Sequence, residues 1–153
     1  MTHERDPGMA RPDLPSAVML LAQGIQMTPD GGLNILGIRP SVATWVFPQP
    51  LPPLVLVTLL SGGQPGRIYS TKYRAYGVDG KMRVESNGQD VPFTTQIKNA
   101  NVCWNLHQIT ADPIMTEAGT YQFGFVIDGE ELTRVSLEVQ DVPQPPGARP
   151  PGA

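Results

Sequence analysis

Apolar and polar residues alternate with a period of two in several stretches of the chain, which is typical of β-strands that bury one face. The clearest stretch, residues 116 to 139, holds two alternating runs on either side of Asp128-Gly129. That dipeptide is a strong hairpin-turn signal. The sequence therefore predicts a long β-hairpin here. Its apolar face is formed by Tyr121, Phe123, Phe125, Ile127, Val135, Leu137 and Val139.

The register of this hairpin follows from the burial of one face. A loop of two or four residues at Asp128-Gly129 places Phe123 opposite Arg134, an apolar side chain against a charged one. A loop of three residues, 128 to 130, pairs Phe123 with Val135 instead. Because a one-residue slip moves every side chain to the other face, the odd offset is favoured and predicts a bulge or a three-residue turn. The same register pairs Tyr121 with Leu137 and Gly119 with Val139.

A second hairpin is predicted for residues 67 to 85, with a two-residue type I′ turn at Asp79-Gly80. In this register Ala75 faces Val84 on an apolar face that Tyr69, Thr71 and Tyr73 continue. The opposite, charged face pairs Tyr76 with Arg83 and Arg74 with Glu85. The last of these pairs is expected to form a cross-strand ion pair.

Further strands are expected at residues 16 to 26 and 33 to 38, joined by a Pro-Asp-Gly-Gly turn. Residues 54 to 60, LVLVTLL, are apolar on both faces, which predicts a strand in the middle of the fold that is covered on both sides. Residues 43 to 47 are expected to form a short edge segment, because five prolines between residues 39 and 53 exclude a central strand.

Residues 102 to 109 alternate as well, and two readings of their faces bear on chemistry. Val102, Trp104 and Leu106 look like the core face of this strand. His107 lies on the opposite face, where we expect it to face solvent or to be hydrogen-bonded, with a role as a ligand as the alternative. Cys103, the single cysteine, is read as a small buried residue, since a disulfide within the chain is impossible.

Proline and composition define the domain. Residues 1–15 and 141–153 are rich in proline and are expected to be disordered tails. The part between them, residues 16–140, is long enough for one domain. Its pattern predicts an all-β protein: a single antiparallel β-sandwich, immunoglobulin-like or similar, with seven to nine strands.

Charge and hydropathy restrict the possible partners. The net charge of −3 argues against a dedicated nucleic-acid-binding protein, which usually carries a basic excess. No run approaches the roughly 18 apolar residues of a membrane span. The apolar run AVMLLA at residues 17 to 22 is short and is read as a buried strand, not as a signal peptide. Together with the single cysteine, this favours a cytoplasmic protein.

No catalytic motif for nucleotide, metalloprotease, serine-hydrolase or thiol-redox chemistry occurs in the chain, so neither an enzyme nor a cofactor is expected. The acidic turn at Asp128, Glu130 and Glu131 is the one cluster dense enough to indicate a metal site, with Asp112 or Glu117 as a further ligand. Oxygen-rich loops at the end of a sandwich can bind Ca²⁺.

A positively charged face is predicted on the second hairpin. Lys72, Arg74 and Arg83 lie on it, with Arg67 and Lys81 nearby. Such a face can meet an anionic partner. The alternative is an ordinary solvated face.

Three segments resemble an uncharacterised family of small bacterial proteins. They are the LNILG segment at residues 33 to 37, the PLPPL entry at residues 50 to 54, and GTYQFGFVIDGEEL at residues 119 to 132. The resemblance covers about residues 16 to 140 and leaves out both tails. It implies a β-sandwich and offers no catalytic residue.

The sequence thus favours a non-catalytic interaction or structural module, with a protein partner or self-association, no nucleic acid and no membrane span. The alternative is a domain that binds a small ligand or Ca²⁺ through the end loops of the sandwich. An enzyme is the least favoured class.

Overall fold

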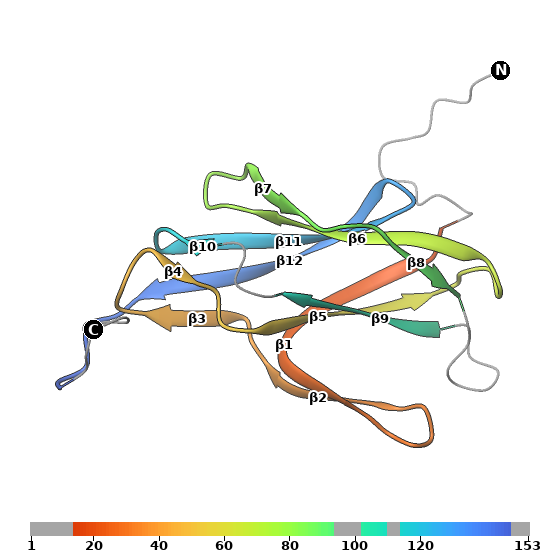
Figure 1. Cartoon of the computed structure of the whole chain (residues 1–153), viewed down its shortest axis with the longest axis horizontal. Coiled ribbons are helices and arrows are strands. Elements are labelled where there is room, and N and C mark those ends of the chain that lie inside the picture. Colours follow the sequence, from red (N-terminus) through yellow and green to blue (C-terminus); the bar gives the residue numbers. More distant parts are fainter. Residues whose placement is uncertain (1–13, 94–101, 110–113, 148–153) are drawn as a thin grey trace.

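The computed structural model describes residues 14–93, 102–109 and 114–147. Two sheets pack face to face, one built around β1 and β5 and the other around β6, β11 and β12 (Figure 1). The described residues contain no helix, and so none that is long and apolar enough to cross a membrane. The all-β sandwich expected from the sequence is confirmed.

The smaller sheet has four strands in the order β2-β1-β5-β9. These are β1 (Ser16–Met27), β2 (Leu33–Ile38), β5 (Leu54–Ser61) and β9 (Val102–Ile109). The larger sheet has the order β3-β12-β11-β6-β7, and β8 also pairs with β6. Its strands are β3 (Ser41–Thr44), β6 (Ile68–Tyr76), β7 (Met82–Glu85), β8 (Gln89–Pro92), β11 (Gly119–Ile127) and β12 (Glu130–Asp141). A separate short pair is formed by β4 (Gln49–Pro50) and β10 (Ile114–Met115).

Most strand pairs are antiparallel, as expected, but β3 runs parallel to the end of β12. This edge strand replaces the segment predicted at residues 43 to 47. The sequence QDVP of β8 is polar and does not by itself indicate the strand that pairs with β6.

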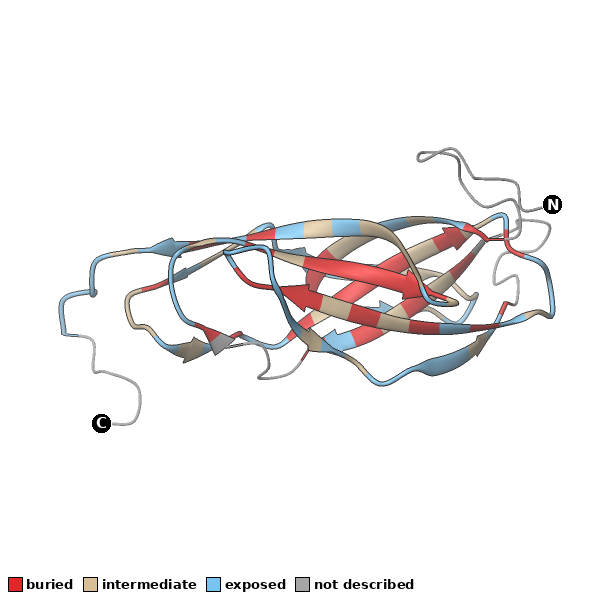
Figure 2. Ribbon diagram, turned by 90° about the horizontal axis from the view of Figure 1, so that it is seen from above, coloured by how far each residue is buried: buried red, intermediate tan, exposed pale blue. Residues whose placement is uncertain are grey.

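The core lies between the two sheets (Figure 2). One cluster gathers Leu21, Leu54 and Leu56 from the small sheet against Phe123 and Leu137 from the large one. A second cluster, farther along the sandwich, contains Leu60, Tyr69, Phe93, Cys103 and Phe125. Close packing of such side chains is the main source of stability for a fold without disulfides.

The β11–β12 hairpin has the predicted register. Phe123 pairs with Val135, and the offset comes from a bulge at Leu132 on β12. The turn itself has two residues, because Ile127 pairs with Glu130. Asp128 and Gly129 both have positive φ, 47° and 81°, as a type I′ turn requires. The predicted bulge is therefore confirmed, and it lies two residues beyond Glu130.

The predicted two-residue turn at Asp79-Gly80 is wrong. The Gly77 amide donates a hydrogen bond to the Lys81 carbonyl (2.9 Å), which leaves a three-residue loop at residues 78 to 80. Only Gly80 has positive φ in this loop. An extra residue on β7 then restores the parity, so Ala75 still pairs with Val84 and Arg74 with Glu85. Tyr76, predicted to face Arg83, pairs with Met82 instead.

The faces of β9 are reversed with respect to the prediction. Cys103, Asn105 and His107 point into the sandwich and are buried, whereas Trp104 and Leu106 lie on the outer face. The register explains this, since His107 pairs with Leu56, which belongs to the core. The expectation that Cys103 is buried is confirmed. The expectation that His107 faces solvent or is hydrogen-bonded is wrong.

Leu14, in the predicted N-terminal tail, is buried in the second core cluster. At the other end, the Val142 amide still donates to the Thr44 carbonyl (2.9 Å). Residues 1–13 and 148–153 of the predicted tails lie outside the described residues.

Tyr121 anchors the entry into β11. Its hydroxyl accepts hydrogen bonds from the Thr116 and Glu117 amides (3.2 and 3.3 Å) and donates to the Glu117 carbonyl (2.8 Å). A tyrosine bonded to backbone a few residues upstream is the tyrosine corner of immunoglobulin-like sandwiches. The spacing in Glu117-Ala-Gly-Thr-Tyr121 was the available sequence signal for it.

Candidate interaction surface

The charged side chains predicted to bind an anion lie on the outer face of the large sheet, and each has a carboxylate beside it. Glu85 accepts from Lys72 Nζ (2.8 Å) and from Arg74 Nε (2.7 Å). These two hydrogen bonds lower the pKa of Glu85. Arg83 pairs with Asp79 across the three-residue loop (2.7 Å). Binding of an anion here stays a prediction, and it would have to compete with these carboxylates.

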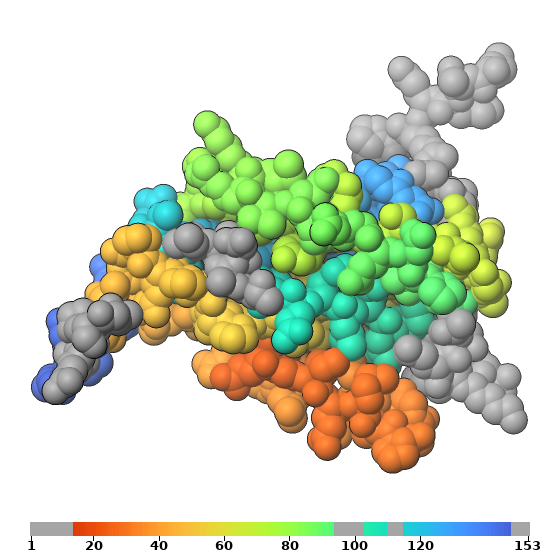
Figure 3. Space-filling model, viewed as in Figure 1, coloured from red at the N-terminus to blue at the C-terminus, as the bar shows by residue number. Residues whose placement is uncertain are grey.

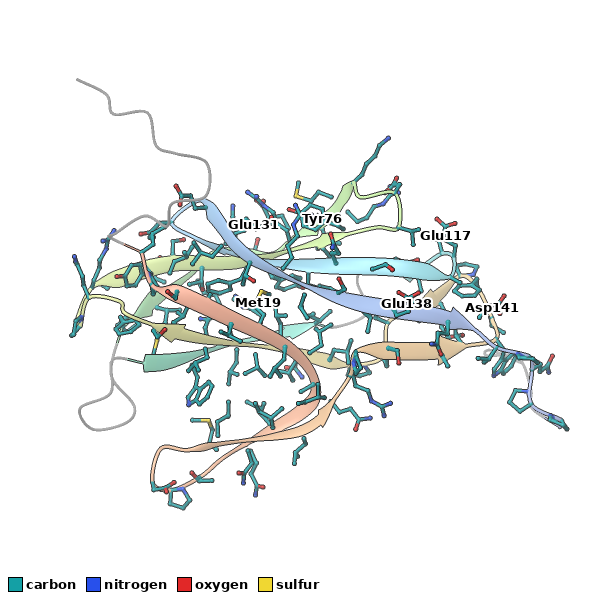
Figure 4. The ribbon with its side chains drawn as sticks, turned by 180° about the vertical axis from the view of Figure 1, so that it is seen from behind. Met19, Tyr76, Glu117, Glu131, Glu138 and Asp141 are labelled. Carbon is teal, nitrogen blue, oxygen red and sulfur yellow. The ribbon has the colours of Figure 1, made fainter. Side chains whose placement is uncertain are left out.

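A second polar cluster crosses β11 on the same face. The Tyr76 hydroxyl donates to Glu131, which also accepts from Arg134 Nε (2.7 Å). The Arg134 guanidinium stacks 3.8 Å from the centre of the Tyr76 ring. Tyr76 and Glu131 come from β6 and β12 and lie next to each other (Figure 4). They meet over Gly124 of β11, where a Cβ atom would collide with the Glu131 carboxylate.

Asp128 ties the β11–β12 turn to β6. Its carboxylate accepts from the Ser70 amide (2.9 Å) and pairs with Arg67 (3.2 Å), while its own amide donates to the Ser70 carbonyl (2.8 Å). Asp is one of the few residues that tolerates the left-handed backbone conformation seen here. The position of Asp128 is thus explained by the turn and its docking.

The structure does not gather the acidic residues proposed as calcium ligands. Asp128 and Glu131 point to different cationic partners, Arg67 and Arg134. Among the residues that the structure describes, no three His, Cys, Asp or Glu side chains form a group able to hold a metal ion. Asp112 lies outside those residues. Calcium binding at Asp128, Glu130 and Glu131 stays a prediction that a calcium titration tests.

The small sheet differs from the large one in having no charged residue. Strands β1, β2, β5 and β9 contain no Asp, Glu, Lys or Arg. Strands β6, β7, β8 and β12 of the large sheet contain ten: Lys72, Arg74, Arg83, Glu85, Asp90, Glu130, Glu131, Arg134, Glu138 and Asp141. Solvent-facing sheets normally carry polar or charged residues on their outer face.

The outer face of the small sheet carries neighbouring apolar side chains, with Gln108 beside Val55 at the β9 edge, because residues paired in a sheet share a face. One row across the sheet is Val18, Leu59 and Trp104, and the next is Leu20, Val57 and Leu106. Ile38 and Leu36 of β2 extend the face beside Ala22 and Gly24. We call these side chains, with Val55, the apolar face.

Much of the apolar face is open to solvent. Val18, Leu36 and Ile38 are 65%, 51% and 61% exposed, while Ala22 and Val57 at the centre are covered. The β1–β2 hairpin that carries Leu36 and Ile38 projects at the bottom of the molecule (Figure 3). A contiguous exposed apolar surface of this kind marks an interaction site in many proteins. The sequence feature that indicated this surface is residues 54 to 60. They are apolar on both faces of the strand, although only one face is fully covered.

Cys103 and His107 are the groups with nucleophilic or acid–base chemistry in the small sheet, and both point inward. Burial raises the pKa of the Cys103 thiol, which keeps it protonated and unreactive. Burial lowers the pKa of His107 to about 4, so its ring is neutral at pH 7.

A family model matches residues 17–140, nearly the whole of the sandwich. The chain belongs to the family of unknown function DUF6941. The resemblance seen in the sequence is thereby confirmed over the same range. A comparison with curated proteins found no match. Membership of DUF6941 assigns no activity to the chain.

Two solved structures resemble the DUF6941 domain distantly. The alkylpurine DNA glycosylase AlkC of Pseudomonas fluorescens, bound to DNA with an abasic-site analogue, matches 80% of this chain at 10% identity and a TM-score of 0.44. This chain spans 30% of that glycosylase chain. The CARDB domain of a Pyrococcus furiosus protein, in complex with di-metal ions, matches 85% of this chain and 97% of its own, at 13% identity and a TM-score of 0.40.

Proposed function

We propose that this DUF6941 domain is a non-catalytic interaction module and that the apolar face binds a second copy of the chain. The observation that carries the proposal is the absence of any charged residue from the four strands of the small sheet. A partner that brought charged groups to this face would leave them desolvated and unpaired, at a cost of several kcal/mol. The same face of a second copy brings none.

The size of the face is compatible with a specific dimer. The central strand β5 has eight residues. Four strands about 4.8 Å apart, with about 3.4 Å per residue, cover roughly 500 Å². Two such faces bury roughly 1,000 Å², which reaches the lower limit for a specific protein interface. A two-fold axis through the face would make it self-complementary, as in most homodimers.

The non-catalytic part of the proposal rests on where the reactive groups lie. Cys103 and His107 are buried in the core. The carboxylates of Asp128, Glu131 and Glu85 are engaged by arginine or lysine side chains on the large sheet. The three carboxylates therefore serve the polar surface of the large sheet, and the buried thiol of Cys103 serves the core.

The test compares two equally exposed isoleucines on opposite sheets. Ile38 lies on the apolar face and is 61% exposed, whereas Ile68 lies on β6 of the large sheet and is 63% exposed. We expect wild type and Ile68→Lys to dimerise in sedimentation-velocity experiments across a concentration series. Ile38→Lys is expected to weaken the dimer by about 100-fold, since it buries a charge in an apolar interface.

The two variants also act as controls for folding, because both positions are exposed and neither side chain packs in the core. Equal thermal stability of the two variants at low protein concentration would show that the substitutions act on association alone. A wild-type protein that stays monomeric up to about 1 mM, or a loss of dimer that is equal in both variants, would overturn the proposal.

A further inference from the structure

A pocket of about 440 Å³ opens between the sheets where β9 faces β6, and nothing in the proposed function uses it. The rings of His107 and Tyr73 line its inner side. The crossing from β7 to β8 lines its outer side with Ser86, Asn87 and Gln89. The volume is within the range of roughly 300 to 1,000 Å³ that is common for small-molecule sites.

The start of the crossing is held against β6 by two hydrogen bonds between Ser86 and Tyr73. The Ser86 hydroxyl accepts from the Tyr73 amide (2.8 Å), and the Ser86 amide donates to the Tyr73 carbonyl (2.9 Å). Strand β7 pairs with β6 only over residues 74 to 76, and β8 pairs with it only over residues 68 to 71. Asn87, between the two strands, and Gln89, the first residue of β8, are exposed at the mouth of the pocket.

His107 is the unusual group in this pocket. It is only 4% exposed, yet neither ring nitrogen has a hydrogen-bond partner among the residues that the structure describes. The ring packs edge-on against Tyr73 and contacts Phe125, with ring centres 5.6 and 6.1 Å apart. Buried polar atoms are nearly always hydrogen-bonded in native proteins, so two orphaned nitrogens on one ring need an explanation. A ligand in the pocket supplies one.

The chemistry of the lining restricts that ligand. A neutral imidazole offers one donor and one acceptor, which matches a hydroxyl group that can both accept and donate. The side chains of Asn87, Gln89 and Gln108 add amide donors and acceptors. Among the described residues of the lining, the one charged group is Glu85, which is already paired with Lys72 and Arg74. The described lining therefore favours a neutral ligand over an ionic one.

We infer that the pocket between β6 and β9 binds a small neutral polyhydroxyl molecule, a sugar or cyclic polyol, whose adjacent hydroxyl groups bond to His107 and to the amides at the mouth.

Saturation-transfer NMR with the full chain at pH 7.5 tests this inference. The probes are methyl α-D-glucoside, methyl β-D-galactoside and myo-inositol, with glucuronate and glucosamine as charged counterparts. We expect at least one neutral probe to bind with a Kd of about 10 mM or tighter, and the charged counterparts to bind at least tenfold more weakly. NMR is preferred to thermal shift because polyols stabilise proteins by exclusion alone.

Two variants locate the binding. His107→Phe fills the same space without polar atoms, and Asn87→Ala trims an exposed side chain at the mouth. Both variants are expected to lower the affinity for the neutral probe at least tenfold. Ile38→Lys, on the apolar face, should bind the neutral probe with the affinity of wild type. This control distinguishes a failure of ligand binding from a failure of the proposed dimer. Absence of binding by every neutral probe, stronger binding of a charged counterpart, or unchanged affinity in both pocket variants would overturn it.

Discussion

The outer faces of the two sheets have opposite chemical character: one is charged and the other is apolar. On the large sheet the charged side chains pair across strands, as Glu85 does with Lys72 and Arg74. Tyr76, Glu131 and Arg134 form a second cluster that crosses a whole strand. The small sheet has no charged residue and leaves Val18, Leu36 and Ile38 largely exposed.

This difference shows where a partner is to be sought. Ion pairs within the domain engage six charged residues of the large sheet, so these charges need no partner outside it. They are Lys72, Arg74, Arg83, Glu85, Glu131 and Arg134. The apolar face of the small sheet has no such arrangement and gains free energy when it is covered. The polar groups predicted as binding residues thus lie on the sheet that needs a partner least.

The largest effect we expect within one chain concerns His107, the one histidine of the charge-free sheet. Its folded-state pKa of about 4 lies below the ordinary value of 6.5, so the unfolded chain binds the proton more tightly. Stability should therefore be unaffected above about pH 6.5 and fall by about 3 kcal/mol as the pH drops to about 4. His107→Phe should remove this loss in urea-unfolding experiments across that range.

The difference between wild type and His107→Phe is the quantity to measure, since other groups also titrate. Glu85 on β7 and Tyr73 on β6 are the titratable side chains that line the pocket with His107. Glu85 has a lowered pKa, so its contribution is lost at lower pH in both proteins. Equal pH profiles for the two proteins would show that His107 is not buried in neutral form.

A smaller effect is expected from Gly124→Ala in the large sheet. The new Cβ would displace the Glu131 carboxylate and separate it from Tyr76. We expect a loss of about 2 kcal/mol, the usual cost of leaving a partly buried charge-assisted hydrogen bond unmade. Chemical denaturation measures it.

A double-mutant cycle sharpens this prediction. In a Glu131→Ala background the obstruction is gone, so Gly124→Ala should cost little. If Gly124→Ala is equally destabilising in both backgrounds, Gly124 is required for the backbone conformation. It is then not required as space for the hydrogen bond between Tyr76 and Glu131.

Glu131→Gln should cost less, about 1 kcal/mol, because the amide keeps one hydrogen bond with Tyr76 and loses the ionic one with Arg134. The loss should shrink in 1 M salt, which screens the ion pair in the wild type. A loss that does not respond to salt would assign the effect to packing around the Tyr76 ring.

The smallest effect is expected from Glu85→Gln at the edge of the same sheet. Its pairs with Lys72 and Arg74 lie in solvent, where ion pairs contribute little. The melting temperature should stay within measurement error of wild type at physiological salt. A clear destabilisation would show that these ion pairs stabilise the large sheet substantially, against the expectation for solvent-exposed pairs.

The two hairpins show how far the sequence reaches. In β11–β12, the need to bury Phe123, Tyr121 and their partners fixed an odd offset, and the structure has that offset. The sequence did not predict which structural feature produces this offset. An odd loop and a two-residue turn with a bulge give the same alternation of side chains. In β6–β7 the Asp-Gly dipeptide predicted a type I′ turn, but only Gly80 takes the left-handed conformation.

The candidate sites were harder to foresee, because they depend on neighbours that are distant in sequence. Asp128 looked like part of an acidic cluster until its partners on β6, Arg67 and Ser70, were in place. Lys72 and Arg74 looked like a free basic face until β7 brought Glu85 beside them. The local sequence shows how many charged residues are present, but not which of them form ion pairs in the fold.

The sequence by itself determined the fold class, the main hairpins and the absence of charge from four strands, since these follow from alternation, turn residues and residue type. Only the tertiary structure decided which face of β9 is inside. Strand β5 is apolar on both faces, so pairing with it gives β9 no preference for burying Trp104 or His107. Packing against the large sheet made the choice, and it placed His107 in the core and an apolar face in solvent.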